Sequence, residues 1–162
     1  MPCYLFTYHA YGSWLPDRSR GYVDRDRGVQ PASPKLAKNC REKVRESEVT
    51  FDKQAQQLIV ETLQQSCPRL EAHCHAIATD ASHVHTLVSW THDRPWESIS
   101  KSLKTSLTRT LNDQLSRRRW FSNGSSRKRV KDREHFEYLV TKYLPSHRGV
   151  CWTEPPPRPS DA

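Results

Sequence analysis

The sequence lacks the patterns that mark metal ribbons, disulfide scaffolds and membrane proteins. Its five cysteines include no Cys-x-x-Cys pair, which argues against a zinc ribbon and against a disulfide framework. No apolar run approaches the roughly 18–20 residues of a membrane span, and no basic segment followed by an apolar one, the layout of a secretion signal, stands at the N-terminus. Internal repeats and a pattern for ATP binding are also missing. We therefore expect a cytosolic protein with reduced thiols and no membrane partner.

Positive charge is what the chain has in excess. Its 26 lysines and arginines outnumber its 18 aspartates and glutamates, so the formal net charge is +8. This charge can serve solubility alone, but it is also typical of proteins that bind a polyanion, because lysine and arginine release counterions when they neutralise phosphates. The length of 162 residues predicts one domain. We place it at residues 1–152 and expect a disordered, proline-rich tail at 153–162.

Hydrophobic periodicity and turn residues predict an alternation of strands and helices. We expect strands at 3–11, 70–79 and 83–90, a surface loop at 17–34, and helices at 34–46, 52–66, 95–115 and 132–144. Asp52 and Asp132 are the expected N-caps, and Asn123-Gly124 predicts a hairpin between two arginine-rich segments. This order favours an α+β fold, a ferredoxin-like βαββαβ sandwich with an additional C-terminal helix.

The strand at residues 83–90 carries the clearest chemical signal. His83 and His85 point to the same side of a strand, roughly 6–7 Å apart, because side chains alternate between faces. Two imidazoles on one rigid face make half of a metal site. They can equally be two hydrogen-bonded strand histidines. His73 and His75 on the preceding strand allow a third interpretation, a closed four-histidine zinc site with a structural role.

A tyrosine on the last helix is the candidate nucleophile. Tyr143 lies on the apolar face of that helix, where a tyrosine usually belongs to the core. His147 follows four residues later, so on a continuous helix a phenol and a third imidazole would be presented together. Pro145 interrupts such a helix. Either the helix kinks there, or His147 follows it in a turn.

The arginine-rich segments point to a substrate. Arginine binds phosphate bidentately, and the aromatic rings of Trp120 and Phe121 between the two segments could stack on unpaired bases. The same charges would also suit a solvated hairpin at a sheet edge. The basic residues of the two segments are Arg117, Arg118, Arg119, Arg127, Lys128 and Arg129.

In combination, these features resemble the single-tyrosine HUH transposases, in particular the REP-associated tyrosine transposases and related insertion-sequence transposases. His83-Val84-His85 matches the His-hydrophobic-His motif, and Tyr143 followed by His147 resembles the nucleophile with its later polar residue. Three further stretches resemble family segments. Ala10-Tyr11-Gly12-Ser13-Trp14-Leu15 resembles the segment after the family's first strand, and residues 101–111 resemble its basic helix. Gly124-Ser125-Ser126-Arg127 resembles the segment before its last helix. The chain departs from many relatives at His147, where Gln or Asn is common, and at Asp80-Ala81-Ser82, where Met-Pro-Asn is common.

The resemblance implies metal-dependent cleavage and rejoining of single-stranded DNA next to a hairpin, in a bacterial-type nucleoid. Tyr143 would be the catalytic residue and would form a 5′-phosphotyrosine link. His83, His85 and His147 would hold Mg²⁺ or Mn²⁺, and Lys101, Lys104 and the arginine-rich segments would hold DNA. The family includes monomers, and homodimers in which the tyrosine of one chain serves the histidine pair of the other.

Two other classes of function fit the same residues. One is a non-catalytic nucleic-acid-binding domain on a ferredoxin-like sheet, which would not need the Tyr143 hydroxyl. The other is a zinc-stabilised structural protein, which would lose its fold on chelation.

Overall fold

The structure is a computed structural model that describes residues 1–13, 22–24, 28–42 and 48–158. Its strands are β1 (Cys3–His9), β2 (Tyr22–Asp24), β3 (Gly28–Gln30), β4 (Ala72–Thr79), β5 (His83–Trp90), β6 (Ser126–Arg129) and β7 (Cys151–Thr153). Its helices are α1 (Pro34–Glu42), α2 (Lys53–Arg69), α3 (Trp96–Gln114) and α4 (Arg133–Tyr138), which continues as a π-helical turn, η1 (Leu139–Tyr143), and a 3₁₀ turn, η2 (Leu144–Ser146). Trp14 and Leu15 of the motif, and much of the predicted loop, lie outside the described residues.

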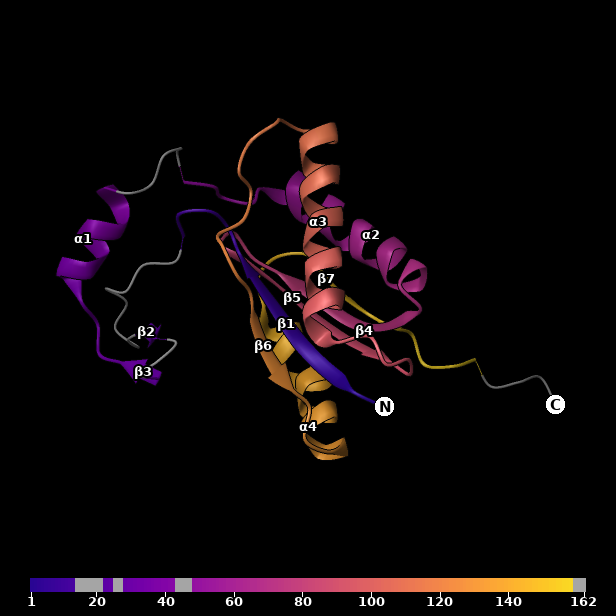
Figure 1. The fold of residues 1–162 in the computed structure, drawn as a ribbon. Coiled ribbons are helices and arrows are strands. Elements are labelled where there is room, and N and C mark those ends of the chain that lie inside the picture. Colours follow the sequence, from indigo (N-terminus) through magenta and orange to yellow (C-terminus); the bar gives the residue numbers. More distant parts are fainter. Residues whose placement is uncertain (14–21, 25–27, 43–47, 159–162) are drawn as a thin grey trace.

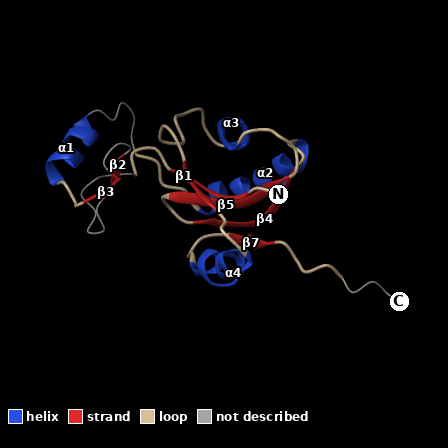
Figure 2. Ribbon diagram, turned by 60° about the horizontal axis from the view of Figure 1, so that its bottom comes forward, coloured by secondary structure: helices blue, strands red, loops and turns tan. Residues whose placement is uncertain are grey.

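Five strands form one antiparallel sheet in the order β6-β1-β5-β4-β7 (Figure 1). The succession β1-α2-β4-β5-α3-β6 is the predicted ferredoxin-like arrangement, and β7 extends the sheet beyond β4. The helices α2 and α3 cover one face of the sheet, whereas α4 lies across the other face (Figure 2). None of the helices in the described part of the chain has the length and apolar character of a membrane span.

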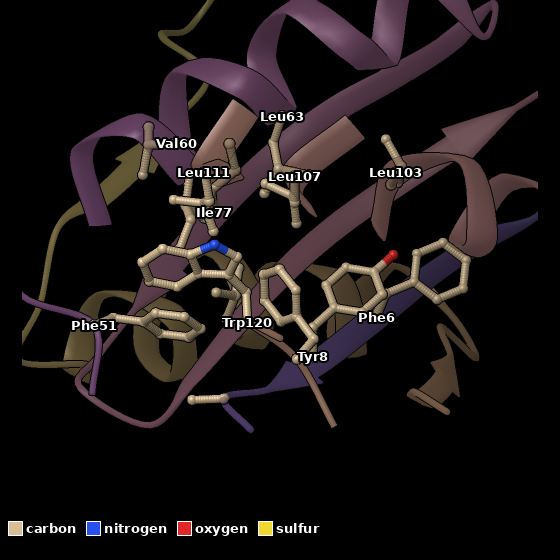
Figure 3. Close-up of a cluster of buried hydrophobic side chains, with 14 of the residues drawn as sticks. Phe6, Tyr8, Phe51, Val60, Leu63, Ile77, Leu103, Leu107, Leu111 and Trp120 are labelled. Carbon is tan, nitrogen blue, oxygen red and sulfur yellow. The ribbon is translucent and has the colours of Figure 1, made fainter. Parts of the chain in front are cut away.

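The two faces of the sheet bury different side chains, because successive strand residues alternate. The main core lies between the sheet and the helices α2 and α3, with large buried side chains that include Phe6, Tyr8, Leu63, Leu103 and Leu107 (Figure 3). A smaller core on the opposite face packs strand residues against the last helical segment and consists of Leu5, Ala76, Ala78, Leu87, Leu139 and Leu144. The side chains of β5 that point to this second face include His83 and His85.

The predicted N-caps are confirmed, but the predicted hairpin at Asn123-Gly124 is wrong. Oδ1 of Asp52 and of Asp132 each accepts a hydrogen bond, at 2.8 Å, from the backbone amide three residues later. After the Asn-Gly turn only β6 forms, and it pairs with β1. Before the turn, Phe121 makes a single bridge to Ala10. Trp120 and Phe121 are buried, so core burial ties this segment to the end of β1 rather than to β6.

A buried glutamine holds the segment that follows η2. Oε1 of Gln56 accepts a hydrogen bond from the backbone amide of Val150 at 3.0 Å, and its Nε2 donates to the carbonyl of Phe51 at 2.8 Å. The amide of Gly149 donates to the carbonyl of Thr79 at 3.0 Å. These contacts fix residues 149–150 against α2 and β4, and thereby the backbone two residues after His147.

We expect Gly149→Ala to destabilise the protein by about 1–3 kcal/mol, the usual effect of overpacking. A Cβ at this position would overlap the Thr79 carbonyl and the Gln56 side chain, although Gly149 does not have a left-handed backbone conformation. Chemical denaturation measures the effect, with Arg148→Ala at the exposed neighbouring position as the control. Equal stability of the Gly149→Ala variant and the wild-type protein would show that this close approach is not needed.

Candidate active site

Three imidazoles meet on the sheet face that α4 covers. His83 and His85 come from β5, and His147 follows η2. The ring centroid of His85 lies 4.7 Å from that of His83 and 4.7 Å from that of His147. The ring centroids of His83 and His147 are 5.6 Å apart. One nitrogen from each ring lies within 4.8 Å of the other two, which is close enough for a single metal ion to contact all three. The structure therefore brings together the three metal ligands predicted from the sequence.

The hydrogen bonds of the three rings select the nitrogen that each presents. Nδ1 of His83 lies 3.0 Å from both Oδ1 of Asp80 and Oγ of Ser82, and Nδ1 of His85 lies 2.7 Å from Oγ1 of Thr7. Nδ1 of His147 lies 3.0 Å from the carbonyl oxygen of Leu144. Carbonyl and carboxylate oxygens only accept, so Nδ1 is the donor in His83 and His147 and Nε2 carries the lone pair. This is the pattern of histidines that bind a metal, so the residues present fit a divalent ion.

Three residues that support this arrangement were not identified as site residues from the sequence. Thr7 stands directly opposite His85 in the β1–β5 pairing, and His9 stands opposite His83. Asp80, which follows β4 directly, lies 3.0 Å from Nδ1 of the His83 ring. The signal that could have found Thr7 and His9 is their spacing, which repeats the spacing of the two histidines on the partner strand.

The electrostatic environment keeps His85 neutral. Burial, together with the neighbouring His83, His147 and His9, lowers the pKa of His85 to about 3, although the Asp80 charge opposes the shift. Burial alone would raise the pKa of Asp80, but hydrogen bonds from Ser82 and the charge of His83 hold it below its usual value. The site thus combines neutral His85 with an ionised carboxylate behind His83.

Tyr143 reaches the same site from the last helical segment. Its Oη lies 3.4 Å from Nε2 of His85, and its ring centroid is 5.2 Å from that of His147. Tyr138, one turn earlier, is 55% exposed and stacks on Tyr143 with ring centroids 6.5 Å apart. Tyr143 therefore belongs both to the edge of the second core and to the group of imidazoles.

Pro145 explains how the chain passes from Tyr143 to His147. Proline has no N–H, and in an α-helix its ring would clash with the carbonyl four residues earlier. The helix instead widens into the π-helical η1, tightens into the 3₁₀ turn η2 and ends. His147 has extended backbone angles, φ −72° and ψ 145°. Of the two alternatives left by the sequence, the structure therefore shows a histidine that follows the helix in a turn.

The four-histidine zinc site considered from the sequence does not form. Nε2 of His75 lies 2.7 Å from Oγ of Ser89, which is four residues from His85 along β5. Within the described residues, His73 and His75 group with Glu154, apart from the His83–His85–His147 set. A β-strand rises about 3.3 Å per residue, so the two groups are roughly 13 Å apart along the sheet.

The predicted DNA-binding residues fall into three groups. Arg127, Lys128 and Arg129 are all exposed on β6, the edge strand. Lys128 pairs with Leu5 and therefore points to the face of the sheet that carries His83 and His85, which we call the histidine face. The Arg127 guanidinium lies 3.9 Å from the centroid of the Trp96 ring, on the α3 side of the sheet. The pairing with β1 thus divides one basic strand between the two faces of the sheet.

The other basic residues lie in the α3–β6 loop or on α3. In the loop, Arg117 is exposed, Arg118 lies over Trp120 and Arg119 lies over Tyr11. Lys101 and Lys104 are on α3, across the sheet from the histidines. The Lys104 ammonium donates to the carbonyls of Ser122 and Gly124, so it holds this loop.

In the metal-free protein we expect His85 to remain neutral far below the usual histidine range. NMR titration of the His85 ring should show a midpoint near pH 3, and a midpoint near pH 6.5 would contradict the buried environment. Because the pKa of His85 is lower in the folded than in the unfolded chain, protonation favours unfolding. The contribution of His85 to stability is therefore complete above about pH 6.5 and declines as the pH falls towards 3.

Comparison with known proteins gives a likeness of structure. No protein-family model matches the chain, and no curated protein matches its sequence. The REP-associated tyrosine transposase, in a structure with a bound REP hairpin, aligns with a TM-score of 0.51 and 8% sequence identity, over 86% of this chain and 62% of that chain. A protein from Deinococcus radiodurans R1 that is assigned as a transposase aligns with a TM-score of 0.49 and 14% identity, over 91% of this chain and 92% of that chain.

The first of these matches carries the structural comparison. The chain spans 62% of the length of that transposase chain, so a substantial part of it has no counterpart in the alignment. At 8% identity the likeness concerns the path of the backbone, and it agrees with the ferredoxin-like arrangement of β1, α2, β4, β5, α3 and β6. The chain has the fold of a REP-associated tyrosine transposase.

Proposed function

We propose that this protein is an HUH-type single-tyrosine transposase, a metal-dependent enzyme that cleaves and rejoins single-stranded DNA through Tyr143. The observation that carries the proposal is the position of the Tyr143 hydroxyl, 3.4 Å from Nε2 of His85 and beside His147. A non-catalytic binding domain would not require a phenol among three imidazoles. The fold shared with a REP-associated tyrosine transposase supports the same conclusion.

His83, His85 and His147 are the residues that would hold the metal ion, through their Nε2 atoms. An imidazole-rich set suits Mn²⁺ better than Mg²⁺ on ligand preference, although either ion can serve. When bound, such an ion supplies Lewis acidity to a non-bridging oxygen of the scissile phosphate. Thr7 and Asp80 act behind the ligands, since they fix the orientation of the His85 and His83 rings.

Tyr143 would carry out the covalent step. Its hydroxyl loses a proton to solvent, and Oη attacks the phosphorus while the bond from phosphorus to the 3′-oxygen breaks. The departing 3′-oxygen takes up a proton, so the products are a 5′-phosphotyrosine and a free 3′-hydroxyl. Attack by the 3′-hydroxyl of another strand reverses the step. The covalent link conserves the energy of the phosphodiester, so rejoining needs no nucleotide cofactor.

The DNA would approach the histidine face from the β6 edge. Lys128 is exposed there and shares the face with the three imidazoles, and the loop arginines extend positive charge beyond the end of β1. The REP-associated tyrosine transposase of similar fold is bound to a REP hairpin, so we propose hairpin DNA with a single-stranded cleavage site as the substrate. Tyr143 lies beside the histidines of its own chain, so a monomer could carry out the cleavage without a residue from a second copy.

We expect the wild-type protein to form a covalent adduct with labelled single-stranded hairpin DNA in Mn²⁺, and Tyr143→Phe to form none. The phenylalanine variant keeps the ring but lacks the attacking oxygen. A denaturing gel detects the adduct as a slowly migrating labelled band. The reaction should also fail in EDTA, because the phosphate then lacks its Lewis acid.

Tyr138→Phe is the matched control for this experiment. Tyr138 lies on the same helical segment and stacks on Tyr143, but its side chain is 55% exposed. The control variant should give the wild-type band. A band of equal intensity from wild type and Tyr143→Phe would exclude Tyr143 as the nucleophile.

Lys128→Ala should weaken DNA binding several-fold and reduce its dependence on salt. Each lysine–phosphate contact contributes about 0.7 to the slope of log affinity against log salt concentration for a single strand. Fluorescence anisotropy over a salt series measures this slope, in a Tyr143→Phe background that prevents cleavage. Lys53→Ala is the control, since Lys53 is exposed on α2 across the sheet. An equal loss in both variants would contradict the proposed path of the DNA.

A further inference from the structure

A second group of metal-binding side chains lies at the other end of the histidine face. It consists of His73 and His75 from β4 and Glu154, the residue after β7, and their ligand atoms lie within 4.8 Å of one another. Oε2 of Glu154 is 2.7 Å from Nε2 of His73 and 3.9 Å from Nδ1 of His75. The ring centroids of the two histidines are 4.6 Å apart. The proposed strand-transfer reaction uses none of these residues.

A β-bulge in β4 lies at the second of the two histidines. The pairing with β5 runs from Cys74 opposite Val88 to Ala76 opposite Leu87, so His75 is the inserted residue. A bulge turns a side chain to a new direction and is a specific feature of a strand rather than a defect. Here the side chains of His73, His75 and Ala76 all point to the face of the sheet on which α4 lies.

The hydrogen bond of His75 to Ser89 leaves its Nδ1 on the side of Glu154. Its Nε2 lies 2.7 Å from Oγ of Ser89, at one side of the ring, while Nδ1 faces the Glu154 carboxylate. Histidines that bind metals through one nitrogen commonly donate a hydrogen bond from the other to an oxygen. The 3.9 Å between Nδ1 and the carboxylate oxygen is too long for a hydrogen bond, so the carboxylate is hydrogen-bonded to His73 and lies near His75 without such a bond.

The spacing of the three ligand atoms suits a small ion of tetrahedral preference. Zn²⁺ binds histidine nitrogen and carboxylate oxygen at about 2.0–2.2 Å, which places the ligand atoms of a tetrahedral site roughly 3.3–3.6 Å apart. This value lies between the observed 2.7 and 3.9 Å. The side chains of His73 and Glu154 are 54% and 42% exposed, so they can adjust to the ion, whereas His75 is held by Ser89. Two imidazoles and one carboxylate form a donor set for Zn²⁺ rather than for Mg²⁺.

We propose that His73, His75 and Glu154 form a second metal site, which binds Zn²⁺ or a similar transition-metal ion, with a water molecule as the fourth ligand, and has a structural role. The bound ion would join β4 to the end of β7, a strand of three residues that pairs only with β4 within the described sheet. It would also fix the His75 ring, which packs edge-on against Phe136 of α4 with centroids 5.0 Å apart. The site thus clamps the sheet edge and the start of the helical segment that ends at Tyr143.

Zinc stoichiometry tests this proposal on the full chain. The protein is first stripped of metal and then titrated with Zn²⁺ in a calorimeter, with native mass spectrometry as a count of bound ions. We expect Glu154→Gln and His73→Ala each to bind one ion fewer than the wild-type protein, or to bind it at least tenfold more weakly. Both residues are partly exposed, so the variants should keep the wild-type circular dichroism spectrum. Zn²⁺ should raise the unfolding temperature of the wild-type protein more than that of Glu154→Gln.

Two controls separate this site from the proposed catalytic one. Glu97→Gln removes a carboxylate that is exposed on α3, away from the group, and should leave Zn²⁺ binding unchanged. A His83→Ala/His147→Ala variant should still lose one ion when Glu154→Gln is added, whether or not the protein cleaves DNA. If Glu154→Gln and His73→Ala bind as many Zn²⁺ ions as the wild-type protein, with equal affinity, the second site does not exist.

Discussion

The antiparallel register between β1 and β5 is the constraint on which the whole candidate active site depends. It places Thr7 opposite His85 and His9 opposite His83, and it sends these four side chains to one face. A shift of one residue would turn all of them into the main core, where Phe6, Tyr8, Val84 and Val88 now pack. The same apolar residues that stabilise the sheet against α2 and α3 therefore also fix the direction of the imidazoles. The positions of the candidate metal ligands follow from the packing of the opposite face.

The third imidazole depends on a different kind of constraint, a chain path set by proline and by close packing. Pro145 ends the helix after Tyr143, and the contacts of Gly149 with Thr79 and of Gln56 with Val150 fix the chain on the other side of His147. His147 is thus held between two fixed points only a few residues apart. Its Nδ1 donates to the carbonyl oxygens of Tyr143 and Leu144, at the point where the helix ends, so helix termination itself orients the ring.

Local signals in the sequence predicted most elements and the shared face of His83 and His85, whereas contacts between distant elements decided the rest. Alternation in the strand at 83–90 correctly placed His83 and His85 on one face, and Asp52 and Asp132 correctly marked helix starts. The predicted arginine hairpin was wrong because Asn123-Gly124 is a local turn signal, whereas the burial of Trp120 and Phe121 is a property of the assembled core. Thr7 and Asp80 were not predicted as site residues for a similar reason. The contact of Thr7 with His85 follows only from strand pairing, and that of Asp80 with His83 only from the fold of the β4–β5 turn. The bulge at His75 leaves no local signal that alternation alone could detect.

The two histidine groups differ in the side chains that surround them. The His83–His85–His147 group has three imidazoles, one of them deeply buried, with Tyr143 beside them. The His73–His75–Glu154 group combines two imidazoles with a partly exposed carboxylate. The helical segment from α4 to η1 touches both, with Phe136 against His75 near its start and Tyr143 against His85 at its end. An ion bound by His73, His75 and Glu154 would therefore influence the position of Tyr143 by anchoring the start of its helical segment through Phe136. It would do so without direct contact with the reacting atoms.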